Sequence, residues 1–239
     1  MQFHLKIANN GVFSIPLNYN YQVQSAIYTM LRQDEAYAAA LHNVGYGENN
    51  AYRIFTFGAL QGNYGIHNKQ LHFDGEIGLE IRSASKAFAK VLKESVLQRG
   101  TIRLFNQTFD ISSMQITDQY VDREEITILT DSPVIAKTTE ENGKTIYYTP
   151  QDEQFEPLMQ YNFQSKYRAF YGEDCAGELH VTPIGRHRKV VTRYKQIWIT
   201  AYYGKFRLQG TPQALTFLYD TGLGAKSSQG FGMFDIIDD

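Results

Sequence analysis

A glycine-rich stretch close to the C-terminus has the composition of a phosphate-binding loop. It spans residues 222–232 and encloses one lysine and two serines. Its glycines adopt positive φ angles freely and let backbone N–H groups approach an anion, to which the lysine and serine side chains would add donors. The candidate contacts are Gly222, Gly224, Lys226, Ser227, Ser228 and Gly230. A flexible hairpin would explain the same composition.

The order of residues in this stretch excludes the triphosphate-binding loop of P-loop proteins. That loop needs glycine directly before its lysine and another glycine five residues earlier. Here Ala225 precedes Lys226, and Asp220 holds the earlier position. The stretch is therefore not a nucleoside triphosphate site of that kind.

Two side chains nearer the N-terminus could transfer protons. His42 ends a predicted helix shortly before Gly45, and imidazole is the one side chain whose unperturbed pKa lies near neutral pH. Tyr28 offers a hydroxyl that could orient or deprotonate a nucleophile. Each also has an ordinary structural explanation, because a histidine at a helix end often only caps the helix and most of the 17 tyrosines must serve packing.

Two separated sets of motifs resemble the CRISPR-associated endoribonucleases that cut precursor CRISPR RNA within its repeats. The series Gly-Leu-Gly, Lys-Ser-Ser and Gly-Phe-Gly, followed by a short apolar strand, is similar to the glycine-rich loop of that family. The N-terminal part matches independently, in order and in rough spacing. Its matching segments are residues 15–21, Ala26-Ile-Tyr28, Leu41-His42, Gly45-Tyr46 and Phe55-Thr-Phe57.

The resemblance implies an α+β fold of two tandem ferredoxin-like domains, with repeat RNA in the cleft between them. It implies attack of a 2′-hydroxyl on the adjacent phosphate, which leaves a 2′,3′-cyclic phosphate and a 5′-hydroxyl without a metal. His42 is then the main proton-transfer group and Tyr28 its partner. We expect no metal and no other cofactor, and no cluster of histidines and carboxylates has metal-binding spacing.

The third catalytic position departs from the family pattern. In the family a lysine often follows the histidine and stabilises the anionic phosphate, whereas this sequence has no lysine or arginine between Gly45 and Tyr52. Arg53 is the first cation beyond that stretch and is our candidate for the role, with Arg32 as the alternative. The same gap favours a rival interpretation, in which a protein of this fold holds repeat RNA without cutting it.

The net charge of −2 conceals a strong segregation of charge. Residues 179–234 contain eight lysines and arginines and one acid, whereas residues 110–160 contain eleven acids and three bases. A basic segment beside a strand rich in aromatic residues suits phosphate contact and base stacking. From it we select as RNA-binding residues Arg186, Arg188, Lys189 and Arg193. The acidic span supports a second rival, an interaction subunit that docks onto a CRISPR surveillance complex.

The spacing of apolar residues predicts the elements that must position these side chains. In the first half we expect strands at 3–7, 52–60, 70–82 and 101–105, and helices at 18–33, 35–42 and from Ser83 or Ser85 to Gly100. Asp34 is the expected N-cap of the second helix. Strand, helix, strand, strand, helix, strand is the ferredoxin-like order.

The second half repeats this order more loosely. We expect strands at 125–129 and 145–149, near 178–181 and 189–191, and at 196–208, with helices within 151–170 and from Pro212 to Gly222. The boundary between the halves falls between residues 115 and 123. We therefore predict an N-terminal domain at 1–118, which carries the catalytic residues, and a C-terminal domain at 119–239, which carries the basic patch and the glycine-rich loop.

Composition bounds the class of protein. A chain of 239 residues with 43% hydrophobic content can bury a sizeable core. Its single cysteine, Cys175, excludes a disulfide framework and a cysteine-based zinc site. The N-terminus lacks the pattern of a signal peptide, and no apolar run approaches membrane-spanning length. We expect a cytoplasmic monomer or homodimer without membrane contact, whose partner is precursor CRISPR RNA and, in the rival interpretation, surveillance-complex subunits.

Overall fold

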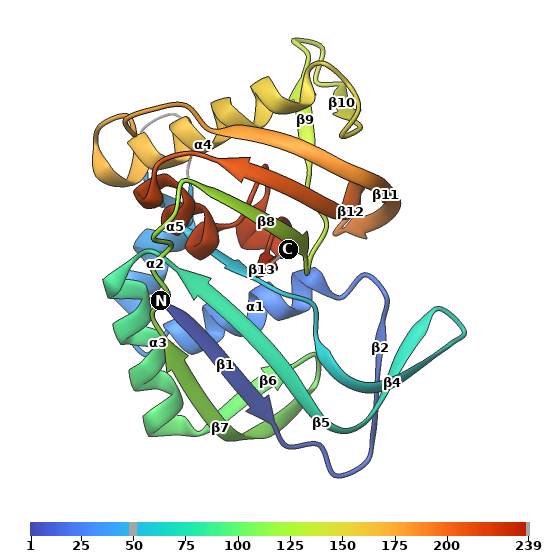
Figure 1. Cartoon of the computed structure of the whole chain (residues 1–239). Helices are drawn as coiled ribbons and strands as arrows, with labels where there is room; N and C mark the ends of the chain where they lie inside the picture. The colour runs from blue at the N-terminus through green and yellow to red at the C-terminus, as the bar shows by residue number, and fades with distance from the viewer. Residues whose placement is uncertain (48–51, 238–239) are drawn as a thin grey trace.

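The chain folds into two lobes that follow the order of the sequence (Figure 1). The structure is a computed structural model, and it describes residues 1–47 and 52–237. Each lobe combines a twisted antiparallel sheet with helices packed against it. The expected α+β class with two ferredoxin-like domains is confirmed. None of the helices in the described part of the chain combines the length and the apolar character needed to cross a membrane.

The N-terminal lobe is built on a sheet centred on strand β1. Its elements are β1 (Gln2–Ile7), β2 (Val12–Pro16), α1 (Asn20–Leu31), α2 (Glu35–Asn43), β3 (Phe55–Phe57), β4 (Gln61–His67), β5 (Gln70–Ser83), α3 (Lys86–Arg99), β6 (Thr101–Leu104) and β7 (Gln107–Thr117). The strand order is β2-β5-β1-β7-β6, and β3 and β4 also pair with the long strand β5. All these pairings are antiparallel.

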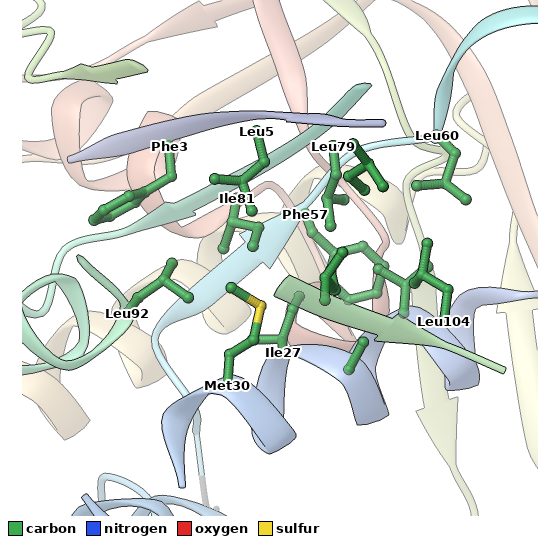
Figure 2. Packing of buried hydrophobic residues seen from close by; sticks show 14 of the residues in the cluster. Phe3, Leu5, Ile27, Met30, Phe57, Leu60, Leu79, Ile81, Leu92 and Leu104 are labelled. Atoms are coloured by element: carbon green, nitrogen blue, oxygen red, sulfur yellow. The ribbon is translucent and has the colours of Figure 1, made fainter. Parts of the chain in front are cut away.

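The core of this lobe follows from two periodicities. Phe3, Leu5 and Ile7 of β1 are all at most 1% exposed, because alternate strand residues face the same side. On that side α1 presents its apolar stripe, which includes Ile27 and Met30, and α3 contributes Leu92 (Figure 2). Burying one such side chain contributes about 1.5–3 kcal/mol. The packing therefore fixes the rotation of α1, and with it the direction of Tyr28.

The C-terminal lobe has a four-stranded sheet in the order β11-β12-β8-β13. Its elements are β8 (Glu125–Thr130), β9 (Ala136–Thr139), β10 (Thr145–Tyr148), α4 (Phe155–Tyr171), β11 (His180–Tyr194), β12 (Ile197–Gln209), α5 (Pro212–Thr221), the 3₁₀ turn η1 (Ser227–Gln229) and β13 (Phe234–Ile237). Helices α4 and α5 share its hydrophobic core. Thr211 caps α5 by accepting from Ala214, and Pro212 occupies the first turn, where it needs no donor.

A buried arginine joins the two lobes. Arg82 at the end of β5 is 1% exposed and donates to the Glu80 carboxylate, to the backbone oxygen of Phe234 and to the Asp235 carboxylate, at 2.5, 2.6 and 2.9 Å. Its guanidinium also lies 4.0 Å from the centre of the Tyr219 ring. A buried charge is tolerated only when its donors are satisfied, so these contacts hold β13 close to the end of β5.

Several expected strands differ from the observed ones. The strand expected at 52–60 is confined to Phe55–Phe57, and the separate strands expected near 178–181 and 189–191 are one strand, β11, with a bulge between Ile184 and Arg188. The strand expected at 145–149 forms only a hairpin with β9, outside the main sheet. Strand β4 was not expected because it is exposed along its whole length and shows no apolar alternation. The domain boundary at residues 118 and 119 stays a prediction.

Candidate active site

Helices α1 and α2 bring the tyrosine and histidine candidates together. Tyr28 on α1 and His42 on the last turn of α2 lie edge to face, with ring centres 5.2 Å apart. The Asp34 side chain accepts from the Tyr37 N–H and caps α2, as expected, and Tyr28 also packs against Phe55. His42 is exposed, and its Nδ1 lies 3.0 Å from Oδ1 of the neighbouring Asn43. The pair is therefore open to a substrate on one side.

Arg53 reaches both residues from the segment before β3. Its Nη2 donates to the backbone oxygen of His42 over 2.5 Å, and its guanidinium hydrogen-bonds the Tyr28 side chain. Burial raises the pKa of the Tyr28 hydroxyl, and the positive charge of Arg53 opposes that rise. Gly45 is required for this approach, because a Cβ there would lie 3.0 Å from Nη1 of Arg53 and 2.5 Å from the backbone oxygen of Tyr52.

A cavity of about 420 Å³ opens beside this cluster. Tyr28 and His42 both line it, and so does Arg32, the alternative cation on α1. Imidazole, phenol and guanidinium groups thus converge on one opening, which is the set of groups needed to move protons beside an anionic centre. We refer to Tyr28, His42 and Arg53 as the catalytic cluster.

The stretch without lysine or arginine includes residues 48–51, which lie outside the described residues. On either side of them Tyr46 and Tyr52 form an isolated β-bridge with N···O distances of 2.8 and 3.0 Å. This bridge returns the chain to the end of α2, where Arg53 follows directly. The sequence separation of eleven residues between His42 and Arg53 therefore conceals a direct contact.

The glycine-rich loop is mostly buried and not an open cradle. Gly222, Gly224 and Gly230 are buried with φ angles of 79°, 78° and 82°. A Cβ on Gly230 would lie 2.4 Å from the Phe57 ring, and one on Gly224 would lie 2.7 Å from the backbone oxygen of Ile135. Packing against both lobes thus accounts for these glycines.

The backbone donors of the loop are largely used within the protein. The N–H groups of Gly222 and Gly230 donate to the backbone oxygens of Leu218 and Ser227. Asn20 of α1 donates to the backbone oxygens of Gln229 and Gly230, each over 3.0 Å, and Gln24 donates to that of Ser228 over 2.6 Å. The N–H groups of Gly222 and Gly230 are therefore not available to a phosphate. The polar side chains of the loop that remain partly accessible are those of Lys226, Ser228 and Gln229.

A second cavity, of about 330 Å³, lies between the loop and the catalytic cluster. It is lined by Arg53, by Lys226, Ser227 and Ser228 of the loop, and by three residues that the sequence had not singled out, Lys137, Asn162 and Lys166. Lys166 occupies the apolar stripe of α4 between Phe163 and Tyr167, and it is 3% exposed. A lysine at a stripe position was the one signal in the sequence that could have drawn attention to it.

The basic residues of β11 are exposed and divide between two faces. Arg188 stacks on Tyr203 and Arg193 on Trp198, each across the strand pair, with the guanidinium carbon 4.3 and 5.9 Å from the ring centre. Because strand residues alternate, these two arginines point to opposite faces of the sheet. Arg188 lines a cleft of about 260 Å³ together with Tyr64 of β4. Arg186 falls in the bulge of β11, and Lys189 is exposed beside Arg188.

His67 and His72 lie on paired strands. They occupy β4 and β5, with ring centres 5.7 Å apart, and Asn68 and Lys69 form the tight turn with φ angles of 50° and 61°. Both histidines lie outside the residues that line the catalytic cavity. Within residues 1–47 and 52–237, no three histidine, cysteine or acidic side chains gather closely enough to hold a metal ion.

Comparisons with known proteins match the whole chain to one family. Residues 14–115 match the family described as "CRISPR-associated protein Cas6, N-terminal", and residues 113–236 match "CRISPR associated protein Cas6, C-terminal". The chain is 28% identical to CRISPR-associated endoribonuclease Cas6 1 of Methanocaldococcus jannaschii, over all of this chain and 94% of that protein. It is 25% identical to CRISPR-associated endoribonuclease Cas6 of Pyrococcus furiosus, over 99% and 90% of the two chains.

Solved structures agree with the sequence matches. A structure titled "CRISPR associated protein Cas6" superimposes with a TM-score of 0.80 at 28% identity, covering all of this chain and 99% of the other. The same order of elements, the paired domains and the glycine-rich loop are thus found together with matches to both family descriptions. On these grounds, the chain belongs to the Cas6 family of CRISPR-associated proteins.

Proposed function

We propose that this chain is an endoribonuclease that cuts precursor CRISPR RNA within its repeats, without a metal, and leaves 2′,3′-cyclic phosphate ends. The observation that carries the proposal is that Arg53 contacts both Tyr28 and His42, and that these two residues line one cavity. The names of the relatives in Methanocaldococcus jannaschii and Pyrococcus furiosus, both CRISPR-associated endoribonucleases, support the choice of substrate.

His42 is the general base in this proposal. Nδ1 of His42 lies 3.0 Å from Oδ1 of Asn43, and a hydrogen bond between them requires the proton on Nδ1, which leaves the lone pair of Nε2 to accept a proton. Nε2 then takes the proton of the 2′-hydroxyl while the 2′-oxygen attacks the adjacent phosphorus. The bond from phosphorus to the 5′-oxygen breaks, and the departing oxygen takes up a proton from the Tyr28 hydroxyl or from water, so the step consumes no added reactant.

Tyr28 acts as a proton donor or an orienting group rather than as a base. Burial raises the pKa of its hydroxyl, so the phenol keeps its proton at neutral pH. Arg53 contacts both Tyr28 and His42. Its positive charge would stabilise the negative charge on the five-coordinate phosphorus of the transition state. This places an arginine in the role that the sequence pattern otherwise assigns to a lysine.

The basic strand and the loop are assigned to RNA binding. The exposed side chains of Arg186, Arg188, Lys189 and Arg193 would contact the RNA backbone, and Tyr64 and Tyr203 offer rings to bases beside Arg188. Lys226, Ser227 and Ser228 would contribute from the loop. A cytoplasmic location follows for a protein that acts on a newly made transcript, and docking onto a surveillance complex through residues 110–160 is a further expectation.

A protein that holds repeat RNA without cutting it is the second candidate. The absence of lysine and arginine between Gly45 and Tyr52 favours it, because a weaker positive field at the phosphate would slow the reaction. RNA affinity without cleavage would identify this function.

The deciding experiment is cleavage of end-labelled repeat RNA in EDTA by the wild-type protein and by His42→Ala. A single cut that carries a cyclic phosphate, lost in His42→Ala and kept in the control His67→Ala, supports the proposal. Tight binding by the wild type without any cut establishes the RNA-holding function instead. Cleavage by His42→Ala at the wild-type rate would show that His42 is not the base.

A further inference from the structure

The cavity between the glycine-rich loop and the catalytic cluster has an unusual charge. Four basic side chains from four separate segments line it, namely Arg53, Lys137 of β9, Lys166 of α4 and Lys226, and the described residues that line it include no aspartate or glutamate. Positive charges gathered in a concave site without a counter-charge raise the local concentration of anions. The cavity is therefore built to receive a negatively charged group.

Two of these lysines repel each other. Burial lowers the pKa of Lys226, and the positive charge of Lys137 lowers it further. Their present partners are neutral and distant, since Lys137 Nζ lies 3.3 Å from Thr139 Oγ1 and Lys226 Nζ lies 3.3 Å from Gln229 Oε1. Within the described part of the chain, neither amine forms an ion pair with a carboxylate. An anion between them would remove this repulsion.

Lys166 holds the opposite wall of the cavity. Its Nζ donates to the backbone oxygens of Thr221 and Gly222, at 3.2 and 2.6 Å, and lies 3.3 Å from Ser227 Oγ. These contacts fix the start of the loop at Thr221 and Gly222, and they fix Ser227 next to Lys226. Lys166 therefore acts as a positioning residue beneath the cavity.

A buried acceptor in the same wall identifies the kind of anion. Oδ1 of Asn162, one turn before Lys166, is buried and has no hydrogen-bond partner. A phosphodiester offers only acceptors, so it cannot satisfy this oxygen. A ribose 2′-hydroxyl next to a phosphodiester offers one donor, and that hydroxyl is the group that distinguishes RNA from DNA. The lining thus suits a nucleotide of RNA better than a nucleotide of DNA.

We propose that this cavity binds one phosphodiester of the bound RNA, between Lys137 and Lys226, together with the adjacent 2′-hydroxyl on Asn162. The inference rests on the proposed function for the identity of the RNA. Because Arg53 lines the cavity and also contacts Tyr28 and His42, the phosphodiester held here is a neighbour of the bond to be cut. Its capture sets which phosphodiester reaches the catalytic cluster.

The test measures the affinity for repeat RNA as a function of salt. In a His42→Ala background, Lys137→Gln is expected to bind severalfold more weakly and to lower the slope of log affinity against log salt by about 0.7, the value for one phosphate contact on a single strand. The control is Lys144→Gln, an exposed lysine on the same hairpin, which should leave slope and affinity unchanged. Equal slopes for both variants would overturn the proposal.

A second arm separates RNA from free anions. Repeat RNAs with single 2′-deoxy substitutions should reveal one position that weakens binding to the parent protein and has no effect on Asn162→Ala. If instead inorganic phosphate alone raises the melting temperature of the wild type and not of Lys137→Gln, with no deoxy-sensitive position, the cavity is a free-anion site and the proposal is wrong.

The two proposals fail in different ways. Cleavage by the wild type, with an unchanged salt slope in Lys137→Gln, would support the endoribonuclease activity and reject the phosphodiester site in the cavity. A reduced slope in Lys137→Gln, without cleavage by the wild type, would support the phosphodiester site in a protein that binds RNA without cutting it.

Discussion

The catalytic cluster and the glycine-rich loop were the two strongest features of the sequence, and the structure treats them in opposite ways. His42 is exposed and makes few contacts, whereas Gly222, Gly224 and Gly230 are buried with packed neighbours on both lobes. In the cluster the packing contacts are made by other residues of helices α1 and α2, so the His42 side chain remains accessible to a substrate. In the loop the backbone packs against both lobes, and the partly accessible residues are Ala225, Lys226, Ser228 and Gln229. Glycine content alone does not distinguish an anion cradle from a tight junction.

The largest effect expected on the cluster side comes from His42→Ala. Loss of the general base should lower the cleavage rate by about 10²–10⁴-fold. Because the side chain is exposed, the melting temperature and the affinity for repeat RNA should stay at wild-type values. Single-turnover cleavage, thermal unfolding and RNA binding measured side by side check this. If His42→Ala lowered the melting temperature as much as Gly230→Ala, the two regions would not differ in their contribution to stability.

Arg53→Lys tests whether the cluster needs a guanidinium or only a charge. Arg53 donates to His42 and Tyr28 at once, and a lysine cannot reproduce that fork geometry. We expect cleavage to fall by about 10²-fold, within the range known for losing one donor to a developing anion, with RNA affinity nearly unchanged. Arg32→Lys is the matched variant, at the arginine that lines the cavity beside Tyr28 and His42. An effect larger in Arg32→Lys would exchange the roles of the two arginines.

On the loop side, Gly230→Ala should destabilise the fold. The new Cβ would meet the Phe57 ring at 2.4 Å, and the residue has a φ of 82°. The left-handed backbone costs about 1–2 kcal/mol and the overpacking about 1–3 kcal/mol more. Gly100→Ala is the control, since Gly100 has a φ of 61° and open space around it, so only the first cost applies. Equal melting temperatures for the two variants would mean that the loop and the Phe57 ring move apart enough to accommodate the new Cβ at no cost.

The smallest effect concerns the dependence of stability on pH. Burial lowers the pKa of Lys166 from 10.5 to about 7, so between these two values the unfolded chain binds a proton that the folded chain lacks. Stability contributed by this group therefore rises as pH increases from about 7 towards 10 and is lower below pH 7. Wild type should gain a few degrees in melting temperature between pH 7 and 9 relative to Lys166→Met. Parallel pH profiles would show that the three acceptors around Nζ keep Lys166 charged throughout.

Local patterns predicted most of the helices and the central strands. The stripe of Val23, Ile27 and Met30 gave α1 to within two residues at each end, and Ser85 caps α3 as expected, with Gly100 ending it in the left-handed region. The glycine-rich loop was placed correctly in the chain but expected to be more open than it is. Strands β4 and β7 were missed because most of their residues are exposed, which removes the alternation on which sequence reading depends. Strand β2 alternates in burial but has only five residues.

The sequence by itself determined the family, the pair of ferredoxin-like domains and the choice of Tyr28 and His42, because periodicity and motif order are local properties of the chain. Only the tertiary structure decided that Arg53 contacts both of them, that Gly230 packs on Phe57, and that Lys137, Lys166 and Lys226 share one cavity. Each of these contacts joins residues whose separation along the chain carries no periodic signal. They form because burial of the two cores fixes the lobes against each other, and no spacing in the sequence records that arrangement.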